Sequence, residues 1–97
     1  MVSWLAGPAS KFRVTSGEPR VWSSNGKALR HFCGTCGTPL YYINETTLPG
    51  LVDLQSATLD DPCAVPPQIQ VQVAERLPWL VHLGDLPAFE RYPKKGP

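Results

Sequence analysis

The stretch RHFCGTCGTPLYY, residues 30–42, contains two cysteines at the spacing C-x-x-C, with apolar segments on both sides. Two thiolates three positions apart can reach one metal ion only when the chain between them turns tightly, and Gly34 permits such a turn. Gly37 can adopt a positive φ, which lets the backbone pass close to the second sulfur. The pattern predicts a zinc knuckle with Cys33 and Cys36 as metal ligands.

A redox dithiol is the main alternative to zinc at this spacing. A redox pair usually precedes a helix in a βαβ unit, whereas strands are expected on both sides here, so the sequence favours zinc. Zinc normally takes four ligands, and water, His31, Cys63 or a second chain would have to complete the shell. His31 is more simply interpreted as a surface residue, and Cys63 as a lone apolar side chain in a loop.

The other polar residues are expected to have ordinary structural roles. Asp60 and Asp61 precede a proline and are expected to make a turn, and His82 is expected to be a packed or half-exposed side chain. The tryptophans and tyrosines are expected to pack in the core or on a sheet face. No arrangement of a nucleophile with a base, and no phosphate-binding loop, is recognisable in the sequence. No catalytic residue is therefore assigned.

The length and composition of the chain indicate one small domain over residues 1–97. Hydrophobic residues make up 42% of the chain, and its 11 prolines and eight glycines favour short elements and tight turns over long helices. A chain of this size buries only about 60% of the surface that its unfolded form exposes. A bound metal or a partner subunit would therefore stabilise it considerably.

Charge and cysteine count narrow the expected partners and compartment. A net charge of +1 gives no reason to expect a nucleic acid or a membrane as partner. No apolar run approaches the roughly 18 residues of a membrane span, and the N-terminus lacks the basic region of a secretory signal. Three cysteines, an odd number, argue against a closed disulfide framework. A cytoplasmic, reducing location is expected.

Alternation of apolar and polar residues predicts short antiparallel strands. The predicted strands are, in order, 11–15, 20–24, 27–32, 39–44, 51–59 and 68–75. The first three form a meander whose second turn is the two-residue pair Asn25–Gly26. One helical turn is expected near residues 87–91, and a frayed end at 94–97. The fold class expected is all-β: a small antiparallel β domain built around a cysteine zinc knuckle.

The order of several motifs resembles the glutathione-dependent formaldehyde-activating enzyme family, whose domain is also shared with centromere protein V. The motifs are FRVTSGEPRVW, SNGKALRHFCGTCGTPLYY, ATLDDP, RLPWL and LPAFERYP, and they extend over about residues 12–93. The resemblance implies a compact β fold around cysteine-bound zinc. It also implies addition of formaldehyde to glutathione, a reaction classed with the carbon–sulfur lyases, so glutathione or a related thiol is the implied partner.

The resemblance further implies zinc ligands that this sequence does not contain. Family members carry an early C-x-C-G and a following C-x-x-C. The C-x-C pair joins the later knuckle, which matches Cys33 and Cys36, in a structural zinc site, and the middle cysteines hold a second, catalytic zinc. The sequence is therefore expected to be an N-terminally shortened family domain. Missing strands would leave an unpaired sheet edge, which favours self-association.

Three hypotheses for function follow. The first is a zinc-binding domain of this family, of carbon–sulfur lyase type, acting on glutathione–aldehyde adducts in complete relatives. The alternative is a non-catalytic structural or interaction module that binds zinc and self-associates. In a homodimer, two knuckles would together supply four thiolates. A zinc-knuckle nucleic-acid binder is least supported, because it would need a basic surface interleaved with aromatic residues.

Overall fold

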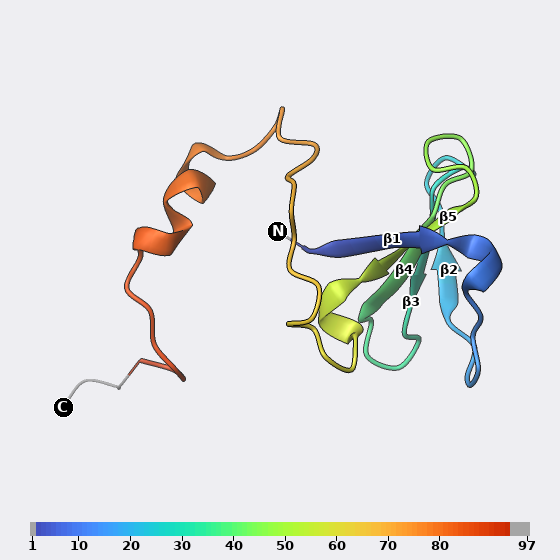
Figure 1. The fold of residues 1–97 in the computed structure, drawn as a ribbon, viewed down its shortest axis with the longest axis horizontal. Coiled ribbons are helices and arrows are strands. Elements are labelled where there is room, and N and C mark those ends of the chain that lie inside the picture. The colour runs from blue at the N-terminus through green and yellow to red at the C-terminus, as the bar shows by residue number, and fades with distance from the viewer. Residues whose placement is uncertain (1, 94–97) are drawn as a thin grey trace.

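The computed structural model describes residues 2–93 and is built on one five-stranded antiparallel sheet with the strand order β1-β5-β4-β3-β2 (Figure 1). Its strands are β1 (Trp4–Pro8), β2 (Arg20–Trp22), β3 (Leu29–Phe32), β4 (Pro39–Ile43) and β5 (Leu51–Gln55). Its helices are short 3-10 segments: η1 (Ala9–Lys11), η2 (Ser56–Thr58) and η3 (Pro78–Asp85). The predicted small, all-β antiparallel fold is confirmed. Within the described residues, no helix has the length and apolar character needed to cross a membrane.

The strands around the cysteines lie where the sequence predicts them. β2, β3 and β4 fall inside their predicted ranges, and β5 ends early because η2 follows it directly. The turn between β2 and β3 is longer than predicted. Asn25 does not sit in a two-residue loop: its side-chain Oδ1 accepts hydrogen bonds of 2.9 Å from the backbone N–H groups of Lys27 and Ala28. Gly26 adopts a φ of +77° and closes this wider loop.

Other expectations about the elements are wrong. The segment 11–15 is not a strand; Phe12 instead packs against Tyr41, with ring centroids 4.7 Å apart. The segment 68–75 pairs with no strand, and Ile69 is 78% exposed. The helical turn expected at 87–91 is absent, and η3 lies earlier in the chain. β1, which the sequence did not predict, pairs with β5. The predicted fraying of 94–97 lies outside the described residues.

The register of the ladder separates the two faces of the sheet, because side chains directly opposite one another in paired strands share a face. One cross-strand row reads Val21, His31, Tyr41, Leu54, Leu5. This row and its neighbour Val52, which is 1% exposed, lie on the core side of the sheet, although Val21 on the edge strand β2 is 51% exposed. The row on the opposite face reads Trp22, Arg30, Tyr42, Asp53, Ala6.

Residues 59–93, which we call the C-terminal arm, extend away from the sheet (Figure 1). From residue 60 to residue 93 every side chain except Leu80 is exposed. The radius of gyration is 16.6 Å, against about 13 Å for a compact chain of this length. The body of the molecule is therefore the sheet, and the arm is not folded onto it.

Candidate functional site

A six-residue turn carrying both cysteines of the C-x-x-C joins β3 to β4. The backbone N–H of Cys33 donates to the carbonyl of Thr38 at 2.9 Å, and the N–H of Gly37 donates to the carbonyl of Cys33 at 2.8 Å. Gly37 has a φ of +79°, a conformation that glycine adopts without strain. The sequence-predicted tight turn is therefore present, closed by backbone hydrogen bonds at its base.

The turn surrounds the Cys33 sulfur with hydrogen-bond donors. The backbone N–H of Cys36, then the N–H of Thr35, and then the Cys36 thiol lower the pKa of Cys33 below its ordinary value, and burial opposes them only weakly. The Cys36 sulfur lies 3.0 Å from Oγ1 of Thr38. These donors favour the thiolate form of Cys33, which is the form that binds a metal.

Both cysteines of the C-x-x-C lie on one turn, and the Cys36 thiol contributes to the lowered pKa of Cys33. Two thiolates of one turn normally supply two of the four ligands of zinc. Within residues 2–93, no group of three or more His, Cys, Asp or Glu side chains comes together to hold a metal. Neither His31 nor Cys63 joins the pair in this conformation. Cys63 is exposed in a turn, where its N–H donates to Asp61.

His31 lies inside the sheet, and the expected surface position is wrong. Its ring stacks on Tyr41 with centroids 4.1 Å apart and planes 15° from parallel. Its Nδ1 is buried without a hydrogen-bond partner. Burial lowers the pKa of His31, and the carbonyl of Leu29 acts in the opposite direction. The imidazole is thus a packed, neutral ring near neutral pH, next to the knuckle but not part of it.

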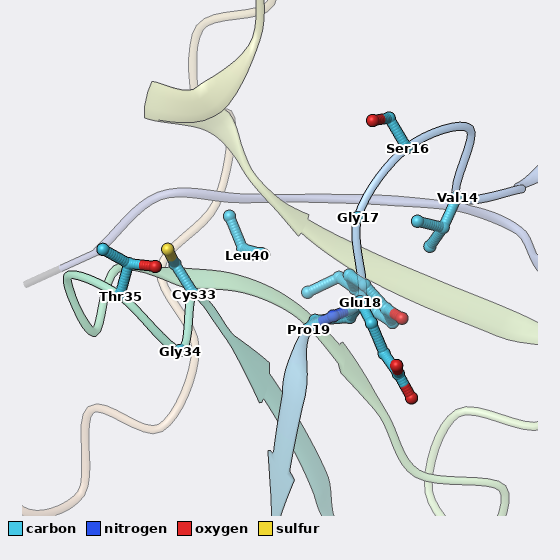
Figure 2. Close-up of a pocket in the computed structure, with 10 residues that line it drawn as sticks. Val14, Ser16, Gly17, Glu18, Pro19, Cys33, Gly34, Thr35 and Leu40 are labelled. Carbon is cyan, nitrogen blue, oxygen red and sulfur yellow. The ribbon is translucent and has the colours of Figure 1, made fainter.

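A hollow of about 380 Å³ opens beside Cys33, between the knuckle and the loop that precedes β2 (Figure 2). Figure 2 shows Cys33 and Thr35 at one end of the hollow and the loop carrying Ser16 and Glu18 at the other. The SGEP stretch of this loop, residues 16–19, lies between two predicted strands, and nothing in the local sequence pattern places it near Cys33. The hollow gives a small polar molecule access to the Cys33 sulfur.

Comparison with known proteins gives one match. The family model described as glutathione-dependent formaldehyde-activating enzyme matches residues 1–75, which include all five strands and the knuckle. No curated protein and no solved structure matches the chain. The matched region contains the whole sheet and both cysteines of the C-x-x-C. The chain belongs to the glutathione-dependent formaldehyde-activating enzyme family.

Proposed function

We propose that this chain is a zinc-binding domain of its family and that Cys33 and Cys36 are two of the zinc ligands. The supporting observation is the knuckle itself: a tight turn that is closed by backbone hydrogen bonds and whose backbone N–H groups lower the pKa of Cys33. Such donors stabilise metal-bound thiolates as well as free ones. A reducing cytoplasm would keep both thiols available for metal.

We further propose that the chemistry served is of carbon–sulfur lyase type, on adducts of glutathione or a related thiol with an aldehyde. In the forming direction the thiolate sulfur adds to the aldehyde carbon, the carbonyl π pair moves to oxygen, and that oxygen takes up a proton; the lyase direction reverses each step. A zinc bound by the knuckle would supply a positive charge that keeps a thiol deprotonated near neutral pH, the role that the resemblance gives to a second zinc in complete relatives. Ser16, Glu18 and Thr35 would offer hydrogen bonds to a thiol substrate in the hollow.

The alternative is a non-catalytic zinc module that associates with a second copy. It is favoured by one observation: within the described residues, no group of three or more His, Cys, Asp or Glu side chains comes together, so a second chain could supply the missing ligands. Two knuckles from two chains would supply four thiolates to a shared zinc. Neither proposal includes a nucleic-acid partner, because a net charge of +1 gives no electrostatic reason to expect one.

Zinc content measured together with native mass tests the metal site. Wild-type chain should bind zinc, and Cys33→Ser and Cys36→Ser should each lose it, while Cys63→Ser, the matched control, should retain it. One zinc per two chains in a dimer indicates a shared knuckle. One zinc per monomer indicates ligands recruited within the chain. Zinc that survives both knuckle substitutions would show that the metal is held elsewhere.

A separate measurement tests the chemistry. Exchange of ¹³C-formaldehyde with glutathione, followed by NMR, reports formation and cleavage of the carbon–sulfur bond. The lyase proposal expects zinc-loaded wild type to accelerate this exchange above the uncatalysed rate and Cys33→Ser to abolish the acceleration. Zinc-loaded protein that gives no acceleration would overturn the lyase proposal and leave the non-catalytic module.

A further inference from the structure

The face of the sheet opposite the core is hollowed and carries aromatic side chains from both edges. A groove of about 490 Å³, which we call the aromatic groove, is lined by residues that include Trp4, Trp22, Arg30, Phe32 and Tyr42, and also by His31 and Tyr41 of the other row. Trp4 lies in β1 and Trp22 in β2, the two edge strands. The hollow therefore includes residues from both edges of the sheet. Trp22 is 57% exposed, so the groove presents apolar surface to solvent.

The C-terminal arm carries a second apolar surface that the same chain leaves uncovered. Eleven large apolar side chains of the arm are exposed, with values from 39% at Leu83 to 96% at Tyr92. They are Val65, Ile69, Val71, Val73, Leu77, Trp79, Val81, Leu83, Leu86, Phe89 and Tyr92. Exposed apolar surface of this extent marks an interaction site.

We propose that the aromatic groove receives η3 of a second copy of this chain, so that two copies exchange their arms reciprocally. The dimensions match. η3 has eight residues in two short 3-10 turns, which meet at a kink where His82 has a φ of −105° and a ψ of 17°. At about 2.0 Å per residue, η3 spans at most roughly 16 Å. The five strands, spaced about 4.8 Å apart, span roughly 19 Å across the face. η3 can therefore lie across the groove with Trp79 between the two edge tryptophans.

The hinge of the arm favours a second copy over the chain's own groove. Pro62, Pro66 and Pro67 interrupt the segment that leaves the sheet. Each proline biases the residue before it toward extended backbone, and a proline-rich segment acts as a semi-rigid spacer. Figure 1 shows the arm running away from the sheet, as such a spacer requires. Residues 61–64 form a turn, in which the N–H of Ala64 donates to the carbonyl of Asp61 at 3.1 Å. Beyond this turn the arm runs away from the sheet of its own chain, which leaves the groove open to a second copy.

Charge and area also suit the exchange. Arg30 projects over Tyr42 at 5.3 Å from the ring centroid and, within the described residues, has no carboxylate in ion-pair range. The arm brings Asp85, whose present contact is a 3.7 Å pair with exposed His82. Fully covered aromatic side chains bury roughly 150–250 Å² each. Four partly covered ones in each of two contacts bury on the order of 1,000 Å², near the lower limit of a specific interface.

The test measures the native mass of the full chain by sedimentation velocity in EDTA, so that shared zinc cannot hold two copies together. The wild type should sediment as a dimer, with twice the chain mass of 10.6 kDa. Trp22→Ala in the groove and Trp79→Ala in the arm should each raise the dimer Kd at least about tenfold. Val21→Ala is the matched control, because Val21 neighbours Trp22 on the same strand but faces the other side. The ¹H–¹⁵N spectrum of each variant shows whether its sheet is folded.

Mixing the variants distinguishes exchange from docking within one chain. The Trp22→Ala chain keeps an intact arm, and the Trp79→Ala chain keeps an intact groove, so a mixture with one partner ¹⁵N-labelled should form heterodimers by native mass spectrometry. A wild-type monomer overturns the proposal, and shielding of its Trp79 from acrylamide in that case would show docking on its own groove. The proposal is also overturned if neither tryptophan substitution weakens the dimer, or if the wild type is a dimer with zinc and a monomer in EDTA.

Discussion

His31 links proton binding to the stability of the sheet. Its ring is stacked on Tyr41, its Nδ1 has no partner, and burial lowers its pKa. The unfolded chain therefore takes up this proton at a higher pH, near the ordinary value of 6.5. Above that value both states are neutral at this site and stability is complete. As the pH falls through 6.5 toward the folded-state pKa, only the unfolded state is protonated, and the free energy of unfolding decreases.

We predict that His31→Phe removes this acid sensitivity. Phenylalanine keeps an aromatic ring against Tyr41 and has no titrating nitrogen. Urea midpoints of the chain in EDTA, compared between about pH 7.5 and about pH 5, should fall less in His31→Phe than in wild type. His82→Gln is the control, since His82 lies exposed on the arm, and it should keep the wild-type loss. An equal loss in His31→Phe and wild type would assign the effect to other groups.

The sequence locates the two metal-binding candidates well but not their surroundings. Cys33 and Cys36 are found by spacing, because two ligands of one turn are necessarily local. That Glu18 and Cys33 line the same hollow depends on how β2 pairs with β3, which no local pattern encodes. His31 looks like a surface residue because its apolar partner Tyr41 lies on the neighbouring strand. Long-range pairing decides both environments.

The strand elements show the same limit. β3 and β4 were predictable because a turn signal and alternating apolar residues coincide around the cysteines. β1, with the sequence WLAGP, has no clear alternation and contains glycine and proline, yet it forms because the edge of β5 offers hydrogen-bond partners. Residues 68–75 alternate cleanly, but no strand edge accepts them within the described chain. A strand needs a partner as well as a pattern.

The knuckle turn is the element on which zinc affinity should depend most directly. Gly37 has a φ of +79°, and no heavy atom lies within 4 Å of the point that a Cβ would occupy, so Gly37→Ala adds backbone strain without a clash. That strain costs about 1–2 kcal/mol. In metal-free protein the turn can relax to relieve it, and zinc binding must then restore the strained conformation. We therefore predict a zinc Kd raised roughly fivefold to thirtyfold in Gly37→Ala, measured by competition with a chromogenic chelator.

Gly26 provides a matched control for that substitution. It has a φ of +77° with the same open surroundings, but it lies in the loop between β2 and β3. Gly26→Ala should lower the free energy of unfolding by a similar amount and leave the zinc Kd unchanged. Equal weakening of zinc binding by both substitutions would mean that affinity follows global stability, not the geometry of the knuckle.

For the whole molecule, stability rests on a very small core. Within residues 2–93, Val52 is the one buried apolar residue, with 1% of its surface exposed. Hydrophobic burial in so small a domain rarely supplies more than about 3–5 kcal/mol of net stability. A metal that ties the end of β3 to the start of β4 would add a constraint at the centre of the sheet, since these two strands flank the knuckle. The metal should therefore have a large effect on unfolding.

We predict that zinc raises the thermal midpoint of the full chain by about 10–20 °C. Free zinc at about 100 times its Kd contributes about 2.7 kcal/mol to a folded state that alone binds it, and each kcal/mol shifts the midpoint of a domain this size by about 4–8 °C. Circular dichroism melts with zinc and with EDTA give the difference. Cys33→Ser and Cys36→Ser should lose most of the shift, and Cys63→Ser should keep it. A full shift in the two knuckle variants would place the stabilising metal outside the C-x-x-C, because a site that has lost one of its thiolates cannot return the same binding free energy to the fold.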